Sequence, residues 1–186
     1  MHLVRDPLPR PPSRTDQVTA MRPQVRVLVC GNVDRCDDGA AIWAIGHLLP
    51  GKSAEDLPGI EVVHCGQLNV DDLIDGGAGA PVLIVDTAVG IAPGRVVTLD
   101  FDALLAHPKQ IAPHSSHALP IDQVIGVARE LSDAPVDGLF VGIGASDLGY
   151  GQKLSRAVRE SMGEFVVAIE KALMRLESTS FAPRVG

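Results

Sequence analysis

The chain has 186 residues, a formal net charge of −7 and a sequence pI near 5.2. This length suits one domain with a substantial core, and the acidic balance, without any stripe of Lys and Arg, excludes a nucleic-acid binder that relies on a basic face. Apolar residues make up 46% of the chain and aromatic residues only 3%, so the core must consist of Val, Ile, Leu and Ala, as in a parallel sheet covered by helices.

Residues 1–24 contain five prolines and show no hydrophobic periodicity, so we expect a disordered N-terminal extension. They lack the apolar segment of a secretory signal, and no run in the chain reaches the roughly 18 apolar residues of a membrane span. We expect one folded domain over residues 25–176 and a tail over 177–186.

The cysteines do not form the pattern of a disulfide framework. Cys30, Cys36 and Cys65 are odd in number and have no CxxC spacing. We therefore expect reduced thiols and a soluble, cytoplasmic protein.

Apolar runs and helical periodicity alternate along the chain. They predict strands at residues 25–30, 60–65, 81–89, 95–100 and 138–145, and helices at 38–49, 69–75, 120–131 and from Ser155 onward. Residues 101–106 are expected to form a short helical or irregular piece. This alternation predicts a three-layer, doubly wound α/β fold: a mostly parallel five-stranded sheet with helices on both faces. The fourth strand follows a short turn and suits an antiparallel edge. We take the common strand order 2-1-3-4-5.

Two adjacent acids, Asp37 and Asp38, follow the first strand in the turn that leads into a helix. Such a turn lies at the carboxyl edge of the sheet, where α/β folds bind their ligands. The structural alternative is that the Asp side chain caps the helix N-terminus. Capping accounts for one carboxylate and not for two, so we expect Asp38 to be functional and Asp37 to act through the helix start.

Asp86 stands at the carboxyl end of the most apolar strand, after Val82 to Val85. The alternative role is to cap the turn that follows, through Gly90 to Gly94. In the assumed strand order, Asp38 and Asp86 lie on either side of the crevice between the first and third strands.

The predicted loop at residues 109–118 carries two histidines, His114 and His117, and we favour His117. Two carboxylates and one imidazole suit Ni, Zn, Fe or Mn with open coordination positions. The alternative is an ordinary loop histidine.

Three segments, GNVDRCDDGAA, LIVDTAVGIAPG and SSHALPIDQVI, occur in this order and spacing. Together they resemble the hydrogenase maturation endopeptidases, over about residues 25–176. The resemblance implies an endopeptidase that removes the C-terminal extension of a nickel-iron hydrogenase large-subunit precursor after nickel insertion. It also implies that Asp38, Asp86 and His117 recognise the nickel and form the catalytic site. The precursor supplies that nickel, and we expect no tightly bound organic cofactor, no nucleic acid, no membrane and a monomer.

The resemblance is incomplete in the first segment. Of the two glycines in the usual Gly-x-Gly-Asn, only the second, Gly31, is kept, and Ala41 replaces the last glycine of the DDGxG form. Hydrolysis through metal-polarised groups and through a carboxylate acting as general base on water are both open. A non-enzymatic nickel-site binding or chaperone module is the alternative function. A flavodoxin-like nucleotide binder is disfavoured because no glycine-rich phosphate loop follows the first strand.

Overall fold

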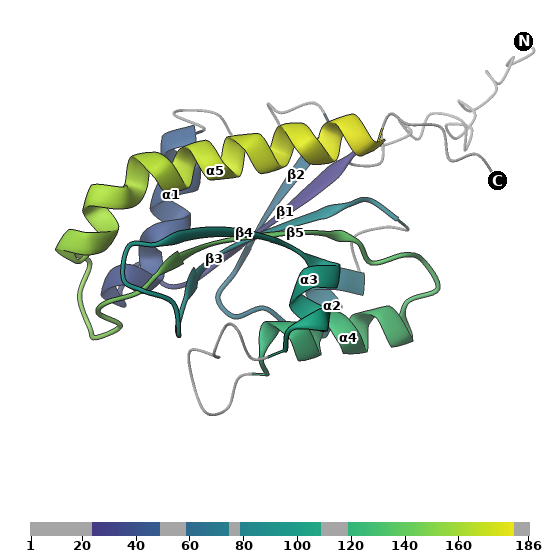
Figure 1. Ribbon diagram of the computed structural model, residues 1–186, viewed down its shortest axis with the longest axis horizontal. Coiled ribbons are helices and arrows are strands. Elements are labelled where there is room, and N and C mark those ends of the chain that lie inside the picture. Colours follow the sequence, from purple (N-terminus) through teal and green to yellow (C-terminus); the bar gives the residue numbers. More distant parts are fainter. Residues whose placement is uncertain (1–23, 49–58, 75–78, 109–118, 181–186) are drawn as a thin grey trace, which may run out of the picture.

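The computed structural model describes residues 24–48, 59–74, 79–108 and 119–180. The expectations for residues 1–23, for the loop at 109–118 and for the tail beyond Ser180 lie outside the described residues. Within them the chain forms one five-stranded sheet in the order β2-β1-β3-β5-β4 (Figure 1). The strands are β1 (Val25–Cys30), β2 (Ile60–Cys65), β3 (Val82–Ala88), β4 (Val96–Asp100) and β5 (Gly138–Gly144).

The sheet is built outward from β1, in which every residue is buried. β1 pairs in parallel with β2 on one side and with β3 on the other, and β3 pairs in parallel with β5. Strands buried on both faces read as continuous apolar runs, which is why the sequence predicts these strands within one or two residues. The mostly parallel α/β fold is confirmed.

The edge of the sheet differs from the prediction in one respect. β4 is antiparallel, as expected, but it pairs with β5 and not with β3. The predicted order 2-1-3-4-5 is therefore wrong at its end. β5 is buried along six of its seven residues, whereas no residue of β4 is fully buried. The strand that is apolar on both faces therefore takes the interior position beside β3, and the half-exposed strand takes the edge.

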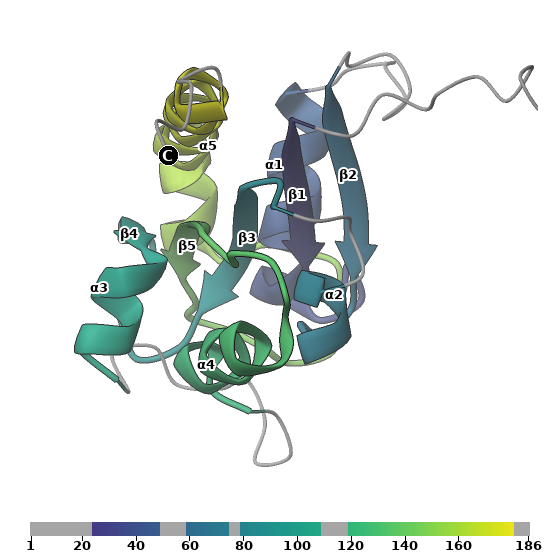
Figure 2. The same ribbon diagram turned by 90° about the vertical axis from the view of Figure 1, so that its right-hand side faces the viewer.

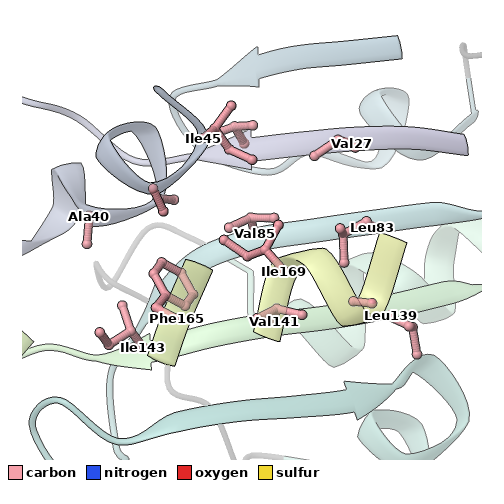
Figure 3. Packing of buried hydrophobic residues seen from close by; sticks show 14 of the residues in the cluster. Val27, Ala40, Ile45, Leu83, Val85, Leu139, Val141, Ile143, Phe165 and Ile169 are labelled. Atoms are coloured by element: carbon pink, nitrogen blue, oxygen red, sulfur yellow. The ribbon is translucent and has the colours of Figure 1, made fainter. Parts of the chain in front are cut away.

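Helices cover both faces of the sheet (Figure 2). One face is covered by α1 (Ala40–Leu48) and α5 (Arg156–Ser180), and the other by α2 (Val70–Ile74), α3 (Phe101–Ala106) and α4 (Ile121–Leu131). On the α1–α5 face, Phe165 and Ile169 of α5 pack toward the sheet residues Val85 and Val141 (Figure 3). Each side chain of this size contributes about 1.5–3 kcal/mol when it is fully buried.

Two helix predictions need correction. Asp37 and Asp38 are not in α1 but in a separate 3-10 turn, η2 (Cys36–Gly39), which precedes it. Leu131, which continues the apolar spacing of Val124, Ile125 and Ala128 and should therefore face the core, is 66% exposed. It is the last residue of α4, and the chain leaves the helix there for β5, so its side chain lies outside the helix–sheet interface. No helix in the described segments has the length and apolar character needed to cross a membrane.

Candidate active site

The loop after β1 is shaped by Gly31. Its φ is +116°, a backbone conformation that L side chains rarely adopt, and a Cβ added there would lie 1.9 Å from the carbonyl oxygen of Asp38. The same Cβ position is 3.9 Å from the carboxyl carbon of Asp38. The glycine therefore allows the Asp38 backbone to fold directly over the end of β1, and the partly buried Asp38 side chain lies beside it.

The neighbouring acid, Asp37, is fully buried and does not cap the helix start. Its Oδ2 accepts the amides of Ser146 and Asp147 at 2.8 and 2.9 Å, and its Oδ1 accepts the amide of Ser155 at 2.6 Å. The predicted role at the start of α1 is thus wrong, since none of these three amides belongs to η2 or α1. A buried carboxylate that accepts several amides is well compensated, and here it ties the loop after β1 to the loop before α5.

Backbone contacts complete this junction between the two loops. The amide of Cys36 donates to the carbonyl of Gly151 at 2.6 Å, and the Gly151 amide donates to the carbonyl of Asp34 at 2.9 Å. Cys36 has a positive φ of 47°, uncommon for a residue with a side chain. The guanidinium of Arg35 lies over the exposed ring of Tyr150, 4.9 Å from its centroid. No local sequence pattern indicates this contact between the two loops, because they are more than 100 residues apart.

Asp86 reaches the same edge of the sheet from β3. Strand alternation points its side chain to the α2–α4 face, together with Ile84 and Ala88. Its Oδ1 accepts the amide of the next residue, Thr87, at 2.7 Å.

A row of polar side chains crosses the end of the sheet at this level. Cys65 pairs with Cys30 in the β1–β2 register, and the β1–β3 register, which joins Val29 to Val85, brings Cys30 level with Asp86. The two buried thiols are free, as expected. A hydrogen bond with Cys65, together with burial and the charge of Asp86, raises the pKa of Cys30 well above its usual value. The same hydrogen bond lowers the pKa of Cys65.

Asp38 and Asp86 are therefore both near the carboxyl end of β1: Asp38 lies beside Gly31, and the β1–β3 register brings Asp86 level with Cys30, one residue earlier. The sequence predicts this meeting point at the ends of β1 and β3. Its position does not depend on the corrected strand order, because β1 and β3 are neighbours in both.

The third predicted residue, His117, and its alternative, His114, lie outside the described residues. The chain is described again from Leu119, and α4 begins at Ile121. Because α4 leads into the start of β5, its N-terminus lies at the carboxyl edge of the sheet (Figure 1). Among the residues with described positions, no three His, Cys, Asp or Glu side chains are grouped so that they could hold a metal ion. A three-residue metal site would therefore need a ligand from outside them.

A doubly wound sheet with two acids at its switch point defines a class of α/β proteins whose chemistry lies at the carboxyl edge. The family model for hydrogenase maturation protease matches residues 60–172, more than half of the chain. The chain belongs to this family, and it is a peptidase. The match includes Asp86 and begins after Asp38. No curated protein matches the sequence significantly.

Solved structures of the same family are similar in fold. The [NiFe] hydrogenase maturation protease HybD from Thermococcus kodakarensis is 25% identical, with a TM-score of 0.61 over 79% of this chain and 97% of that one. The hydrogenase maturating endopeptidase HybD from E. coli is 19% identical, with a TM-score of 0.62 over 81% of this chain and 92% of that one. The solution structure of the endopeptidase HycI from E. coli is 21% identical, with a TM-score of 0.56 over 79% and 89%.

Proposed function

We propose that this peptidase removes the C-terminal extension of a nickel-iron hydrogenase large-subunit precursor, and that it recognises the nickel already inserted there. The observation that carries the proposal is the convergence of Asp38 and Asp86 on the end of β1 in a member of this family. Asp37 beside them has a separate structural role, because its carboxylate accepts amides from the loop before α5.

Asp38, Asp86 and His117 are the proposed nickel ligands and catalytic residues. Two carboxylates and one imidazole hold a borderline divalent ion only moderately when they act alone. The precursor brings both the ion and the rest of its ligands, so these side chains need to fill only open positions. Weak affinity for the free ion would make recognition depend on ion and polypeptide together. The nickel thus belongs to the substrate, and the proposal includes no organic cofactor.

The hydrolytic step has two forms that this chain's residues could support. In one, a carboxylate of Asp38 or Asp86 takes a proton from the attacking water as general base. In the other, both carboxylates hold the substrate's ion in place while the ion polarises the scissile carbonyl or a water. In both forms, water adds across the peptide bond and the two products are the mature subunit and the released C-terminal peptide.

The test is to incubate the protein with nickel-loaded precursor and to follow the mass of the large subunit. We expect a shortened subunit with the wild type and an unchanged one with Asp38→Asn, because this substitution removes the charge at almost constant volume. The control is Asp133→Asn, which removes an exposed carboxylate from the loop between α4 and β5, at the opposite edge of the sheet. It should process the precursor like the wild type.

Full processing by Asp38→Asn would contradict the assignment of Asp38. An unchanged precursor mass with the wild type, although the two proteins bind each other, would replace the peptidase proposal with a binding or chaperone module.

A further inference from the structure

Thr87 directly follows Asp86 on β3, and its side chain points to the opposite, α1–α5 side of the sheet. Its hydroxyl donates to the carbonyl oxygen of Asp37 at 2.8 Å. Thr87 is 1% exposed and Asp37 is 0% exposed. Thr87 is next to Asp86 in the chain, and Asp37 is next to Asp38. The buried hydrogen bond between Thr87 and Asp37 thus links the two segments that carry the proposed catalytic carboxylates.

Thr87 contacts both carboxylate-bearing segments. Its amide donates to Oδ1 of Asp86 at 2.7 Å, while its hydroxyl holds the peptide unit between Asp37 and Asp38. The hydrogen bond from the Thr87 amide orients the Asp86 carboxylate relative to β3. The hydrogen bond from the Thr87 hydroxyl holds η2 at a set distance from β3.

The hydroxyl is not needed merely to satisfy the Asp37 carbonyl. That oxygen also accepts the amide of Ala40, which closes the 3-10 turn, and a carbonyl has two lone pairs. Without the hydroxyl the turn would keep its own hydrogen bond and would lose this hydrogen bond to β3. The Asp37 carboxylate is held on its far side by the amides of the loop before α5, so the hydroxyl attaches β3 to a unit that is already rigid.

We propose that Thr87 is a positioning residue that sets the separation of Asp38 and Asp86 for the peptidase reaction; this inference rests on the proposed function. Ligands of one ion must be held within about 0.5 Å of their working geometry. A misplacement of about 1 Å can reduce the rate roughly 100-fold. The link through Asp37 forms this geometry before the precursor binds.

The decisive variant is Thr87→Val, which keeps the shape of the side chain and removes the hydroxyl. We expect kcat for precursor processing to fall about 10- to 100-fold at a temperature where the protein is fully folded, with a smaller change in KM. Thr87→Ser keeps the hydroxyl and should recover most of the lost rate. Thr98→Val, on the exposed face of the edge strand β4, is the matched control and should process like the wild type.

A crystal structure of Thr87→Val gives a readout that does not depend on activity. The distance between the Asp38 and Asp86 carboxylates should differ from that in wild-type crystals by more than about 0.5 Å, and should return to the wild-type value in Thr87→Ser. If Thr87→Val does not fold, Thr87→Ala, which adds no new atoms, takes its place in both measurements.

An unchanged separation, or an unchanged kcat in a folded variant without the hydroxyl, overturns the inference. An equal loss of rate in Thr87→Ser also overturns it, because a merely structural loss would not be repaired by the hydroxyl. Failure of the proposed function gives a different result: the wild type itself would leave the precursor mass unchanged, while the crystallographic comparison would still test the position of the two acids.

Discussion

The two sides of the carboxyl edge of this sheet are built in different ways. On the α1–α5 side, the loop after β1 and the loop before α5 are joined by the buried Asp37 carboxylate, by backbone bonds and by the Thr87 hydroxyl. On the α2–α4 side, two buried thiols and Asp86 lie in a row, and the hydrogen bond with Cys65, burial and the charge of Asp86 together raise the pKa of Cys30. One side is held by compensated hydrogen bonds, and the other presents ionisable groups close together.

The difference suggests that the α1–α5 side supports the site and that the α2–α4 side carries reactive groups. Buried polar groups with all partners in place rigidify a structure, as Asp37 does. Ionisable groups that shift one another's pKa are typical of reactive sites, although structural networks also produce such shifts. Asp38 lies in η2, which belongs to the α1–α5 side, and Asp86 points to the α2–α4 side. The candidate site therefore lies where these two sides of the sheet edge meet. If the α1–α5 side is the mechanical support, breaking its contacts should lower stability, whereas changes on the α2–α4 side should alter reactivity.

The largest effect is expected from Gly31→Ala. The new Cβ would lie 1.9 Å from the Asp38 carbonyl at a φ of +116°, so the loop must move, at a cost of about 3–5 kcal/mol in the free energy of unfolding. Urea unfolding measures this change. Gly46→Ala is the control: a Cβ on this exposed residue of α1 meets no atom within 4 Å, and we expect a gain of about 0.5–1 kcal/mol. Equal stability of Gly31→Ala and the wild type would contradict the described loop.

Asp37→Asn should have the next largest effect. The amide nitrogen that replaces one carboxylate oxygen would face a backbone N–H, so at least one of the three hydrogen bonds is lost without compensation. We expect a loss of about 2–4 kcal/mol in the free energy of unfolding, measured in the same urea titration. The control is Asp34→Asn, which changes an exposed carboxylate of the same junction. Its Oδ1 accepts a hydrogen bond from the Gln152 side chain. We expect its free energy of unfolding to stay within about 0.5 kcal/mol of the wild type. Similar losses of stability in both variants would contradict the supporting role of the buried Asp37 carboxylate.

The smallest effect concerns reactivity on the α2–α4 side and leaves stability almost unchanged. Because the hydrogen bond from Cys30 lowers the pKa of Cys65, Cys65 forms its thiolate at a lower pH than Cys30 or Cys36, whose pKa values are raised. Iodoacetamide should therefore label Cys65 first, as peptide mass spectrometry across a pH series would reveal. Cys30→Ala removes the donor and should move the labelling midpoint of Cys65 to higher pH. Labelling of Cys30 before Cys65 would contradict the described pair.

The sequence was sufficient wherever burial alone determines the pattern. The apolar run at residues 25–30, the long strand before Asp86 and the periodicity of Val158, Phe165 and Ile169 in α5 predict the elements and their inward faces, because side-chain period follows directly from backbone geometry. The motif GNVDRCDDGAA and the strand-end position of Asp86 were also enough to place Asp38 and Asp86 at the carboxyl ends of β1 and β3.

Long-range partnerships were decided only by the tertiary structure. Nothing local distinguishes Asp37 from Asp38; one is buried against amides from the loop before α5 and the other lies over Gly31, because the fold brings that distant loop to one of them. The pairing of β4 with β5, the alignment of Cys30 with Cys65 and the contact from Thr87 to Asp37 have the same origin. Each depends on where a partner far along the chain comes to lie, and a sequence pattern records only what a residue's own segment must bury.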